Sequence, residues 1–253
     1  MTDATQKPQT DRAAPEGILG EVSSYWDTRS EGYDAQVQKE EDEGAIARYL
    51  PDLGEVRGRD VLDIGCGPGF FACALARAGA RVTACDISPE MLEKTSARAR
   101  AQGLEVSVRR LDAQALPFAE GSFDLVCSRN VVWNLEHPRE AYRQWLSVLR
   151  PGGRIVVFDG NHYRHYFDAA YARARKAPLP QDNHILLGVS TSKIDALARS
   201  LPLGRVERPQ WDEKTLLELG AASASSRVLS TITDPEDGRA LVFDFVVTAL
   251  KGA

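Results

Sequence analysis

Residues 59–69 read Arg-Asp-Val-Leu-Asp-Ile-Gly-Cys-Gly-Pro-Gly, and this stretch decides the fold class of the 253-residue chain. Its apolar run, residues 61–64, predicts a buried strand, and the three glycines that follow predict a turn with almost no side chains. Residues 70–78 read as a helix, and residues 80–85 read as a second strand that ends at Asp86. A strand, a glycine loop, a helix and a second strand ending in an acid bind an adenosine-containing ligand at the carboxyl ends of parallel strands.

The spacing of the glycines indicates which ligand the loop binds. A dinucleotide loop has the pattern G-x-G-x-x-G, whereas here the glycines are Gly65, Gly67 and Gly69, and Phe70 stands at the third dinucleotide position. Asp63 also precedes the loop, where its carboxylate would repel a pyrophosphate but suits an ammonium group. The pattern therefore favours an adenosine that carries an ammonium and no phosphate, which is S-adenosylmethionine.

Asp86 completes the pattern, because a carboxylate at the end of the second strand can accept hydrogen bonds from both ribose hydroxyls. At residues 61–69 the chain resembles the class I S-adenosylmethionine-dependent methyltransferases. The resemblance implies an enzyme with that cofactor and an α/β fold, namely a doubly wound, Rossmann-like, seven-stranded sheet with an antiparallel last strand and a helical cap insertion. A generic α/β turn is the alternative, and the agreement of loop, spacing and both acids weighs against it.

The remaining pattern of elements supports a mostly parallel sheet, because strands alternate with helices as far as Gly160. Further strands are predicted at 106–110, 123–128, 154–158, 227–233 and 241–250, and further helices at 40–50, 89–102, 138–149, 164–176, 190–200 and 212–219. We therefore expect a disordered tail (1–17), a cofactor-binding core with an N-terminal lid helix (18–160), a helical substrate cap (161–208) and a C-terminal helix and strands that complete the sheet (209–253).

The N-terminal segment at residues 18–34 reads as a helix and turn that carries Tyr25, Trp26 and Tyr33 in an otherwise polar region. In the resembling family, a Trp-Asp…Tyr-Asp segment at this place folds over the cofactor as a lid. The alternative is a surface helix packed by its aromatic side chains. The lid is favoured because large aromatic side chains need burial, and a bound cofactor provides it.

Cofactor contacts are predicted from the N-terminal helix, the glycine loop and the strand ends. Asp112 follows the third strand and can accept from the adenine amino group, with turn formation as its alternative role. Met91 can flank the adenine or pack in the core. The complete predicted set is Tyr25, Arg29, Tyr33, Asp63, Gly65, Cys66, Gly67, Gly69, Asp86, Ile87, Met91, Asp112, Ala113, Ser128, Arg129 and Asn130.

The residues after the fourth and fifth strands are the candidates for catalysis and substrate binding, because loops at this sheet edge face the ligand. The run from Asn130 to Asn161 resembles bacterial N-methyltransferases that tailor natural products, in which an N-terminal tyrosine and an aromatic residue frame the transferred methyl. That resemblance makes Tyr25 and Trp133 catalytic candidates, although packing is an equal alternative for Trp133. Tyr163, which follows the fifth strand, is the third candidate because it could act as a base. The substrate candidates are Asn134, Asp159, Asn161 and His162.

Composition limits the classes of partner and cofactor. The net charge of −5 disfavours a nucleic-acid partner, since phosphates need a basic face. The four cysteines lack metal-ligand spacing and read as buried residues in a reducing compartment, and His162 with His165 lacks a third ligand, so no metal is expected. The sequence has neither a signal peptide nor an apolar run of membrane length. We expect a soluble, cytoplasmic protein with a small-molecule methyl acceptor, no membrane contact and a possible homo-oligomeric state.

The expected reaction is methyl transfer from S-adenosylmethionine to a small molecule, either a metabolite or a natural product. The sequence offers no unambiguous strong base, which favours N-methylation over O-methylation, since an amine that has lost its proton needs only positioning. C-methylation of a quinone-like ring is the first alternative. A binding module without catalysis is the second, and the presence of Asp63, Asp86 and Asp112 weighs against it.

Overall fold

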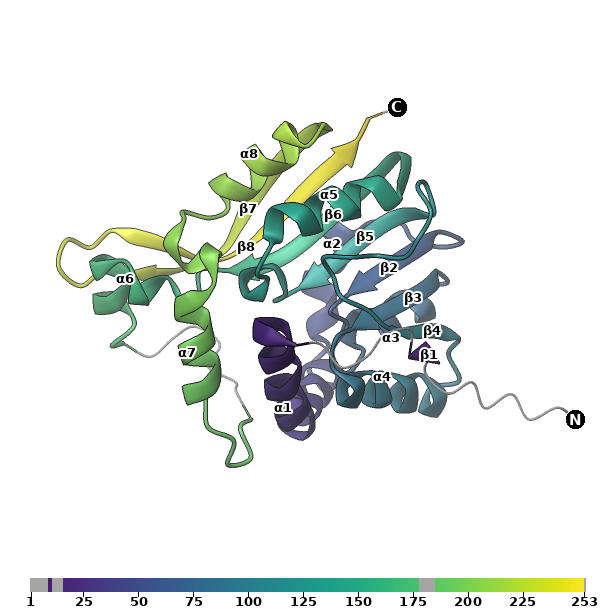
Figure 1. Ribbon diagram of the computed structural model, residues 1–253, viewed down its shortest axis with the longest axis horizontal. Coiled ribbons are helices and arrows are strands. Elements are labelled where there is room, and N and C mark those ends of the chain that lie inside the picture. Colours follow the sequence, from purple (N-terminus) through teal and green to yellow (C-terminus); the bar gives the residue numbers. More distant parts are fainter. Residues whose placement is uncertain (1–8, 11–15, 178–184, 253) are drawn as a thin grey trace, which may run out of the picture.

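The computed structural model of the protein describes residues 9–10, 16–177 and 185–252. Its described strands form one sheet in the order β1-β4-β3-β2-β5-β6-β8-β7 (Figure 1). The strands are β1 (Gln9–Thr10), β2 (Asp60–Ile64), β3 (Arg81–Asp86), β4 (Val106–Arg110), β5 (Phe123–Arg129), β6 (Leu149–Gly160), β7 (Ala221–Thr233) and β8 (Ala240–Lys251). Strands β2 to β6 are parallel, and β8 is antiparallel to both β6 and β7. The predicted mixed seven-stranded sheet with an antiparallel last strand is therefore confirmed.

The predicted tail, residues 1–17, falls largely outside the described residues. Within it, the two-residue strand β1 pairs in parallel with Arg109 and Arg110 of β4 and adds an eighth described strand to the sheet edge. Gly17 already belongs to the first helix. Residues 9–10 thus pair at an open sheet edge, where backbone pairing needs no particular side chains, and the disordered tail stays a prediction for the residues before α1 that the structure does not describe.

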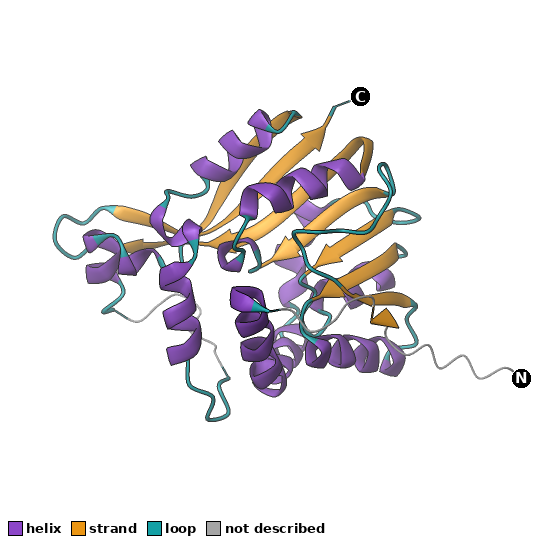
Figure 2. Cartoon of the chain, in the orientation of Figure 1, coloured by secondary structure: helices purple, strands orange, loops and turns teal. Residues whose placement is uncertain are grey.

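Helices cover both faces of the sheet (Figure 2). The helices are α1 (Gly17–Asp42), α2 (Leu50–Leu53), α3 (Phe70–Arg77), α4 (Pro89–Ala101), α5 (Pro138–Val148), α6 (Ala169–Ala174), α7 (Ser192–Ser200) and α8 (Gln210–Glu218), with 3₁₀ turns η1 (Ala45–Arg48), η2 (Val132–Asn134), η3 (Arg164–Tyr166) and η4 (Pro202–Arg205). No helix in the described part of the chain is both long enough and apolar enough to span a membrane.

Each face of the sheet has its own hydrophobic core, because successive strand residues point to opposite faces. Leu62 and Ile64 of β2 pack on the side of α5 and α8, with Trp145 and Leu216. Val61 packs on the opposite side, in the cluster that holds residues of α1, α3 and α4. Burial on both faces explains why the central strands read as continuous apolar runs.

The N-terminal helix is longer than the sequence predicted. Residues 18–34 and 40–50 were expected to form separate helices, the second ended by Pro51, yet α1 runs without a break for 26 residues to Asp42. Gly44, with φ of 67°, lies between α1 and the turn η1. Pro51 lies in the first turn of α2, where a missing backbone N–H leaves no bond unmade. The proline therefore begins a helix and does not end one.

The segment after β6 contacts the N-terminal helix. The helix predicted at 164–176 is divided into η3 and α6, and the side chain of Asp168 caps α6 by accepting from the backbone N–H groups of Ala170 and Tyr171. Helix α7 packs on α1 through Ile194 and Leu197. The Pro-rich stretch 178–180 lies outside the described residues. The segment predicted to form the cap therefore contacts α1 through α7, and its role as a substrate cap stays a prediction.

Candidate functional site

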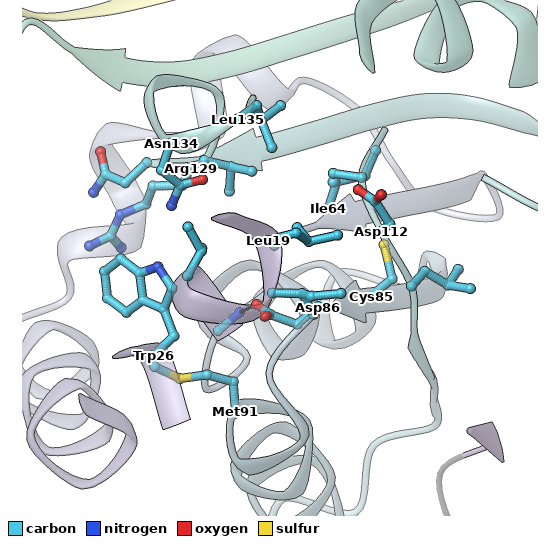
Figure 3. A pocket seen from close by; sticks show the side chains of 18 of the residues that line it. Leu19, Trp26, Ile64, Cys85, Asp86, Met91, Asp112, Arg129, Asn134 and Leu135 are labelled. Carbon is cyan, nitrogen blue, oxygen red and sulfur yellow. Dashed lines mark hydrogen bonds between the residues drawn. The ribbon is translucent and has the colours of Figure 1, made fainter. Parts of the chain in front are cut away.

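An open cavity lies at the carboxyl ends of β2, β3 and β5, next to α1 (Figure 3). Arg129, Trp26 and Asn134 lie toward one end of the cavity, and Asp112 and Cys85 lie toward the other. The predicted site residues that line it are Tyr33, Gly65, Gly67, Asp86, Ile87, Met91, Asp112, Ala113, Arg129, Asn130 and Asn134.

The glycine loop leaves no room for side chains at two of its positions. Gly65 has φ of 63°, and a Cβ atom on it would lie 2.2 Å from Cγ2 of Val131. Gly67 has φ of 53°, and its Cβ would lie 3.3 Å from the ring of Tyr33. The left-handed backbone and these close neighbours require glycine. The loop, α1 and the residues after β5 therefore meet around one edge of the cavity.

Asp86 is held by the backbone on the cavity wall. Its Oδ2 accepts from the N–H of Gly67 at 2.9 Å, and its Oδ1 accepts from the N–H of Ser88 at 2.9 Å. Burial raises the pKa of this carboxyl, and the two backbone bonds oppose that rise. Each oxygen has a further lone pair, so a carboxylate fixed in this way can also accept from two neighbouring hydroxyl groups.

Asp63 is a buried carboxyl beneath the loop, and one of its oxygens lacks a hydrogen-bond partner among the described residues. It is 2% exposed, and among the described residues its Oδ2 has no hydrogen-bond partner. Burial, with the charge of Asp86 as a further cause, raises the pKa of Asp63 to about 7. A buried charge needs a partner of opposite charge. An ammonium group is such a partner, so this carboxyl fits the amino group of S-adenosylmethionine.

Arg129 supplies the complementary charge. Its Nη2 forms an ion pair of 2.6 Å with Oε2 of Glu40, and its guanidinium lies over the rings of Phe70 and Tyr49. The Nη1 atom is buried and has no hydrogen-bond partner in the described part of the chain. A free guanidinium N–H on a cavity wall suits a carboxylate. Asp63 and Arg129 together fit the two charged groups of an amino acid.

The residues at the two ends of the cavity have special local geometry. Asn130 has φ of 57°, which is rare for a residue other than glycine, and its backbone N–H donates to the carbonyl of Phe158 at 2.8 Å. Asp112 Oδ1 accepts from the backbone and side-chain amides of Gln114. Asp112 therefore forms a turn and also lines the cavity, so the two roles that the sequence left open are compatible.

Other predicted cofactor residues lie outside the cavity lining: Tyr25, Arg29, Asp63, Cys66, Gly69 and Ser128. Arg29 is buried, and its Nη1 donates to the carbonyl of Ile185 at 2.8 Å. Gly69 begins α3 with φ of 94°, and Cys66 contacts Thr95. These residues shape the loop and its surroundings, and a direct contact with the cofactor stays a prediction for them.

The three catalytic candidates lie in one apolar cluster beside the cavity. Tyr25 and Trp133 are 5% and 8% exposed and pack with residues of α7. The ring of Tyr163 lies against Trp133, with centroids 4.6 Å apart. Burial raises the pKa of Tyr25 and Tyr163, so neither phenol is activated as a base. The structure thus brings the three residues together through packing, and a catalytic role for them stays a prediction.

Three of the four substrate candidates bind other parts of the protein. Asp159 pairs with the buried Arg208, the Asn161 side chain donates to two backbone carbonyls, and His162 Nε2 lies 3.2 Å from Oδ1 of Asp244. Each of these side chains is turned toward the C-terminal segments, and a contact with the substrate stays a prediction for them. Asn134 does line the cavity, and in its best amide orientation it accepts from Trp26 Nε1 at 3.3 Å.

The sequence interpretation missed the apolar part of the lining. It named Trp26 only as a lid residue, and it did not place Leu19 or Val22 in the site. These three lining residues of α1 follow helical spacing and share one face of the helix. That spacing is the sequence pattern that could have predicted their place in the lining. The other unpredicted lining residues are Ile64, Cys85, Leu111, Val131 and Leu135. Over residues 16–177 and 185–252 no three His, Cys, Asp or Glu side chains gather as a metal site would require.

Comparison with known proteins agrees with this geometry. Residues 62–157 match the family described as a methyltransferase domain. This part of the chain is a class I methyltransferase domain. Its fold resembles that of an S-adenosylmethionine-dependent methyltransferase from Mesorhizobium loti, with 25% identity, a TM-score of 0.56, and coverage of 82% of this chain and 96% of the other. S-adenosylmethionine is the cofactor of this domain type.

Two curated relatives match parts of the domain. An uncharacterised protein of Mycobacterium tuberculosis is 45% identical over 104 residues, which are 41% of this chain and 38% of the relative. The demethylmenaquinone methyltransferase of Tropheryma whipplei is 36% identical over 129 residues, which are 51% of this chain and 53% of that enzyme. The chain thus spans well under two thirds of the length of these relatives.

Proposed function

We propose that the protein transfers a methyl group from S-adenosylmethionine to a small-molecule acceptor. The observation that carries the proposal is the buried carboxyl of Asp63, whose open oxygen lies beneath a glycine loop next to the cavity. A buried carboxyl without a cation is unfavourable, and an ammonium group would remove that penalty. The methyltransferase family match over residues 62–157 supports the same ligand.

The cavity residues have separate roles in this proposal. Asp63 holds the ammonium of the cofactor and Arg129 holds its carboxylate. Asp86 accepts from the ribose hydroxyls and Asp112 accepts from the adenine amino group. Arg129, Asp86 and Asp112 follow the cavity in this order from one end to the other, whereas Asp63 is buried outside the described lining. The cofactor supplies an activated methyl group when it is bound.

The chain itself contributes proximity, orientation and exclusion of water. Leu19, Val22, Trp26 and Leu135 make much of the lining apolar, and Asn134 adds a neutral polar group. An acceptor with a flat or apolar body and one polar group suits such a wall. The carboxylates in the described lining, Asp86 and Asp112, already accept backbone bonds. We therefore favour an amine acceptor that loses its proton before attack, with O-methylation as the next choice.

C-methylation of a quinone-like ring is the second candidate. The observation in its favour is the relative from Tropheryma whipplei, which is named a demethylmenaquinone methyltransferase and is 36% identical over half of this chain. A planar ring also suits an apolar wall that includes Trp26. This reaction activates a ring carbon and not an amine, so the two candidates take different acceptors.

The test supplies purified protein with methyl-labelled S-adenosylmethionine and three acceptor panels: aryl or alkyl amines, phenols, and reduced naphthoquinones. Labelled product from the amine panel, absent with the Asp86→Asn variant, supports the favoured reaction. Product from the naphthoquinone panel alone replaces it with the second candidate. If calorimetry detects no binding of S-adenosylhomocysteine, the proposal that this cavity takes the cofactor is overturned.

A further inference from the structure

A cluster of buried charges lies beyond the family match, between the end of β6 and the start of α8. Arg208 forms a two-point ion pair with Asp212, with Nε to Oδ2 at 2.8 Å and Nη2 to Oδ1 at 2.7 Å. Its Nη1 lies 3.2 Å from Oδ2 of Asp159, which is an ion-pair contact without hydrogen-bond geometry. All three residues are 2% exposed or less. One guanidinium therefore joins two carboxylates that come from different elements.

This cluster reaches the wall of the cofactor cavity through Asp159. The same Oδ2 atom of Asp159 accepts from the backbone N–H of Trp133 at 3.0 Å, and Oδ1 accepts from the N–H of Gly160 at 2.8 Å. Trp133 lies in the turn η2, between the lining residues Val131 and Asn134. The carboxylate thus fixes the backbone of a turn that carries part of the cavity lining.

The contacts continue from this turn to the glycine loop. Val131 fills the space beside Gly65, because a Cβ at Gly65 would lie 2.2 Å from Cγ2 of Val131. A small displacement of the turn would move Val131 either into the loop or away from it. Close-packed interiors transmit such shifts and do not absorb them. The position of Arg208 is therefore linked by contact to the loop that binds the cofactor.

The charged side chains of the cluster do more than fill space, because apolar side chains could fill the same space. Two carboxylates face one guanidinium, and Tyr142 Oη donates to Oδ1 of Asp212 at 2.6 Å. Burial raises the pKa of the Tyr142 hydroxyl far above its ordinary value, so it remains a donor. Burying such charges is unfavourable compared with apolar packing, and removing one partner leaves the other charges buried and unpaired. What the ion cluster adds is a fixed orientation of its charged side chains.

We propose that Arg208 is a positioning residue of the methyl-transfer site. It orients Asp159, Asp159 holds the backbone N–H of Trp133, and the turn η2 then places Val131 and Asn134 in the cavity wall. This inference rests on the proposed function, because it takes the cavity to be the cofactor site. It assigns to the segment after residue 157 a part in shaping that site, and it removes Asp159 from the substrate contacts.

The test compares Arg208→Lys with the matched control Arg173→Lys. Arg173 also forms a two-point ion pair, with Asp234, but it joins α6 to the β7–β8 turn and not to the cavity. Lysine keeps the charge and loses the fork that bridges two carboxylates. We expect Arg208→Lys to raise hydrogen exchange at the Trp133 amide at least tenfold and to weaken S-adenosylhomocysteine binding several-fold. The control should change neither quantity.

Asp159→Asn provides a second variant that leaves the Arg208–Asp212 pair in place. Its single side-chain oxygen can accept from Trp133 or from Gly160 but not from both, so exchange should rise at one of the two amides. Unchanged exchange at the Trp133 amide in Arg208→Lys, or at both amides in Asp159→Asn, overturns the positioning role. So does an equal loss of binding in the Arg173 control. Neither readout requires turnover, so a wild-type protein that binds the ligand and methylates nothing overturns the proposed reaction and leaves this inference standing.

Discussion

Arg129 at the end of β5 and Glu40 in α1 form an ion pair 89 residues apart in the sequence, with 2.6 Å between Nη2 and Oε2. Both side chains are largely buried, at 11% and 13% exposure. Because Arg129 also lines the cavity, this pair attaches the N-terminal helix to the cavity wall. Further ion pairs join Glu31 to Lys94 and connect Arg98 to α1. The segment predicted to be a lid is therefore a helix that packs along α4 and contacts the end of β5.

The Nη1 atom of Arg129, which has no hydrogen-bond partner among the described residues, leads to a prediction about the amino-acid portion of the ligand. Arg129→Met should weaken S-adenosylhomocysteine binding about tenfold to a hundredfold, since a charge-assisted hydrogen bond contributes about 1.5–3 kcal/mol. Methylthioadenosine lacks the amino-acid portion, so its affinity should stay the same. Calorimetry with both ligands measures the difference. Equal losses for the two ligands would show that the variant merely disturbs the cavity, as would an equal effect of Arg98→Met, which breaks ion pairs of α1 elsewhere.

Asp63 leads to a prediction about pH. Its pKa is about 7 in the folded chain and 3.8 in the unfolded reference, so the folded state binds the proton more tightly between these values. Stability contributed by this group therefore falls as pH rises from about 4 to 7. Asp63→Asn removes that loss, and the pKa difference corresponds to at most about 4 kcal/mol.

Urea unfolding of Asp63→Asn and of the wild type at pH 4 and pH 8 checks the prediction. The variant should be more stable than the wild type at pH 8 and nearly equal to it at pH 4, while its affinity for S-adenosylhomocysteine falls. A variant less stable at pH 8 would mean that the carboxylate already has a favourable partner in the cofactor-free protein.

Alanine substitutions at Gly65 and Gly44 distinguish the cost of backbone strain from the cost of a steric clash. Both have φ near 65°, but nothing lies within 4 Å of a Cβ at Gly44, whereas Val131 occupies that place at Gly65. Gly44→Ala should cost roughly 1–2 kcal/mol from the left-handed backbone alone. Gly65→Ala should cost more and abolish S-adenosylhomocysteine binding, as measured by thermal unfolding and calorimetry. Retained binding in Gly65→Ala would mean that Val131 moves freely, contrary to the close packing of loop and turn.

The docked helix α1 leads to a prediction about truncation. Removing residues 1–16 should leave S-adenosylhomocysteine binding nearly unchanged, because among the described residues the cavity lining from this end of the chain begins at Leu19. Removing residues 1–34 should abolish binding, since Val22, Trp26 and Tyr33 also belong to the lining. Circular dichroism shows whether the shorter protein keeps its α/β core. Protection of α1 from proteases should rise with ligand, and no change on adding ligand would mean that its aromatic residues serve packing alone.

The local sequence pattern was sufficient to predict those parts of the site that lie within a few residues of a strand end. The strand at 60–64, the glycine loop and Asp86 were predicted to within a residue, because strand, turn and acid follow one another along the chain. Parallel strands then bring Asp86, Asp112 and Arg129 to one sheet edge in any fold of this kind. The sheet class and many of the residues that line the cavity were therefore determined by sequence alone.

Only the tertiary structure decided which polar side chains face the cavity and which bind the protein. Asp159 lies at the end of a strand as Asp86 does, yet it pairs with Arg208, which lies about fifty residues farther along the chain. Tyr25 and Trp26 are neighbours on one helix, but Tyr25 packs against α7 while Trp26 lines the cavity. The physical reason is that a side chain's direction depends on the charge or apolar surface that folding brings beside it, and segments distant in sequence supply that surface.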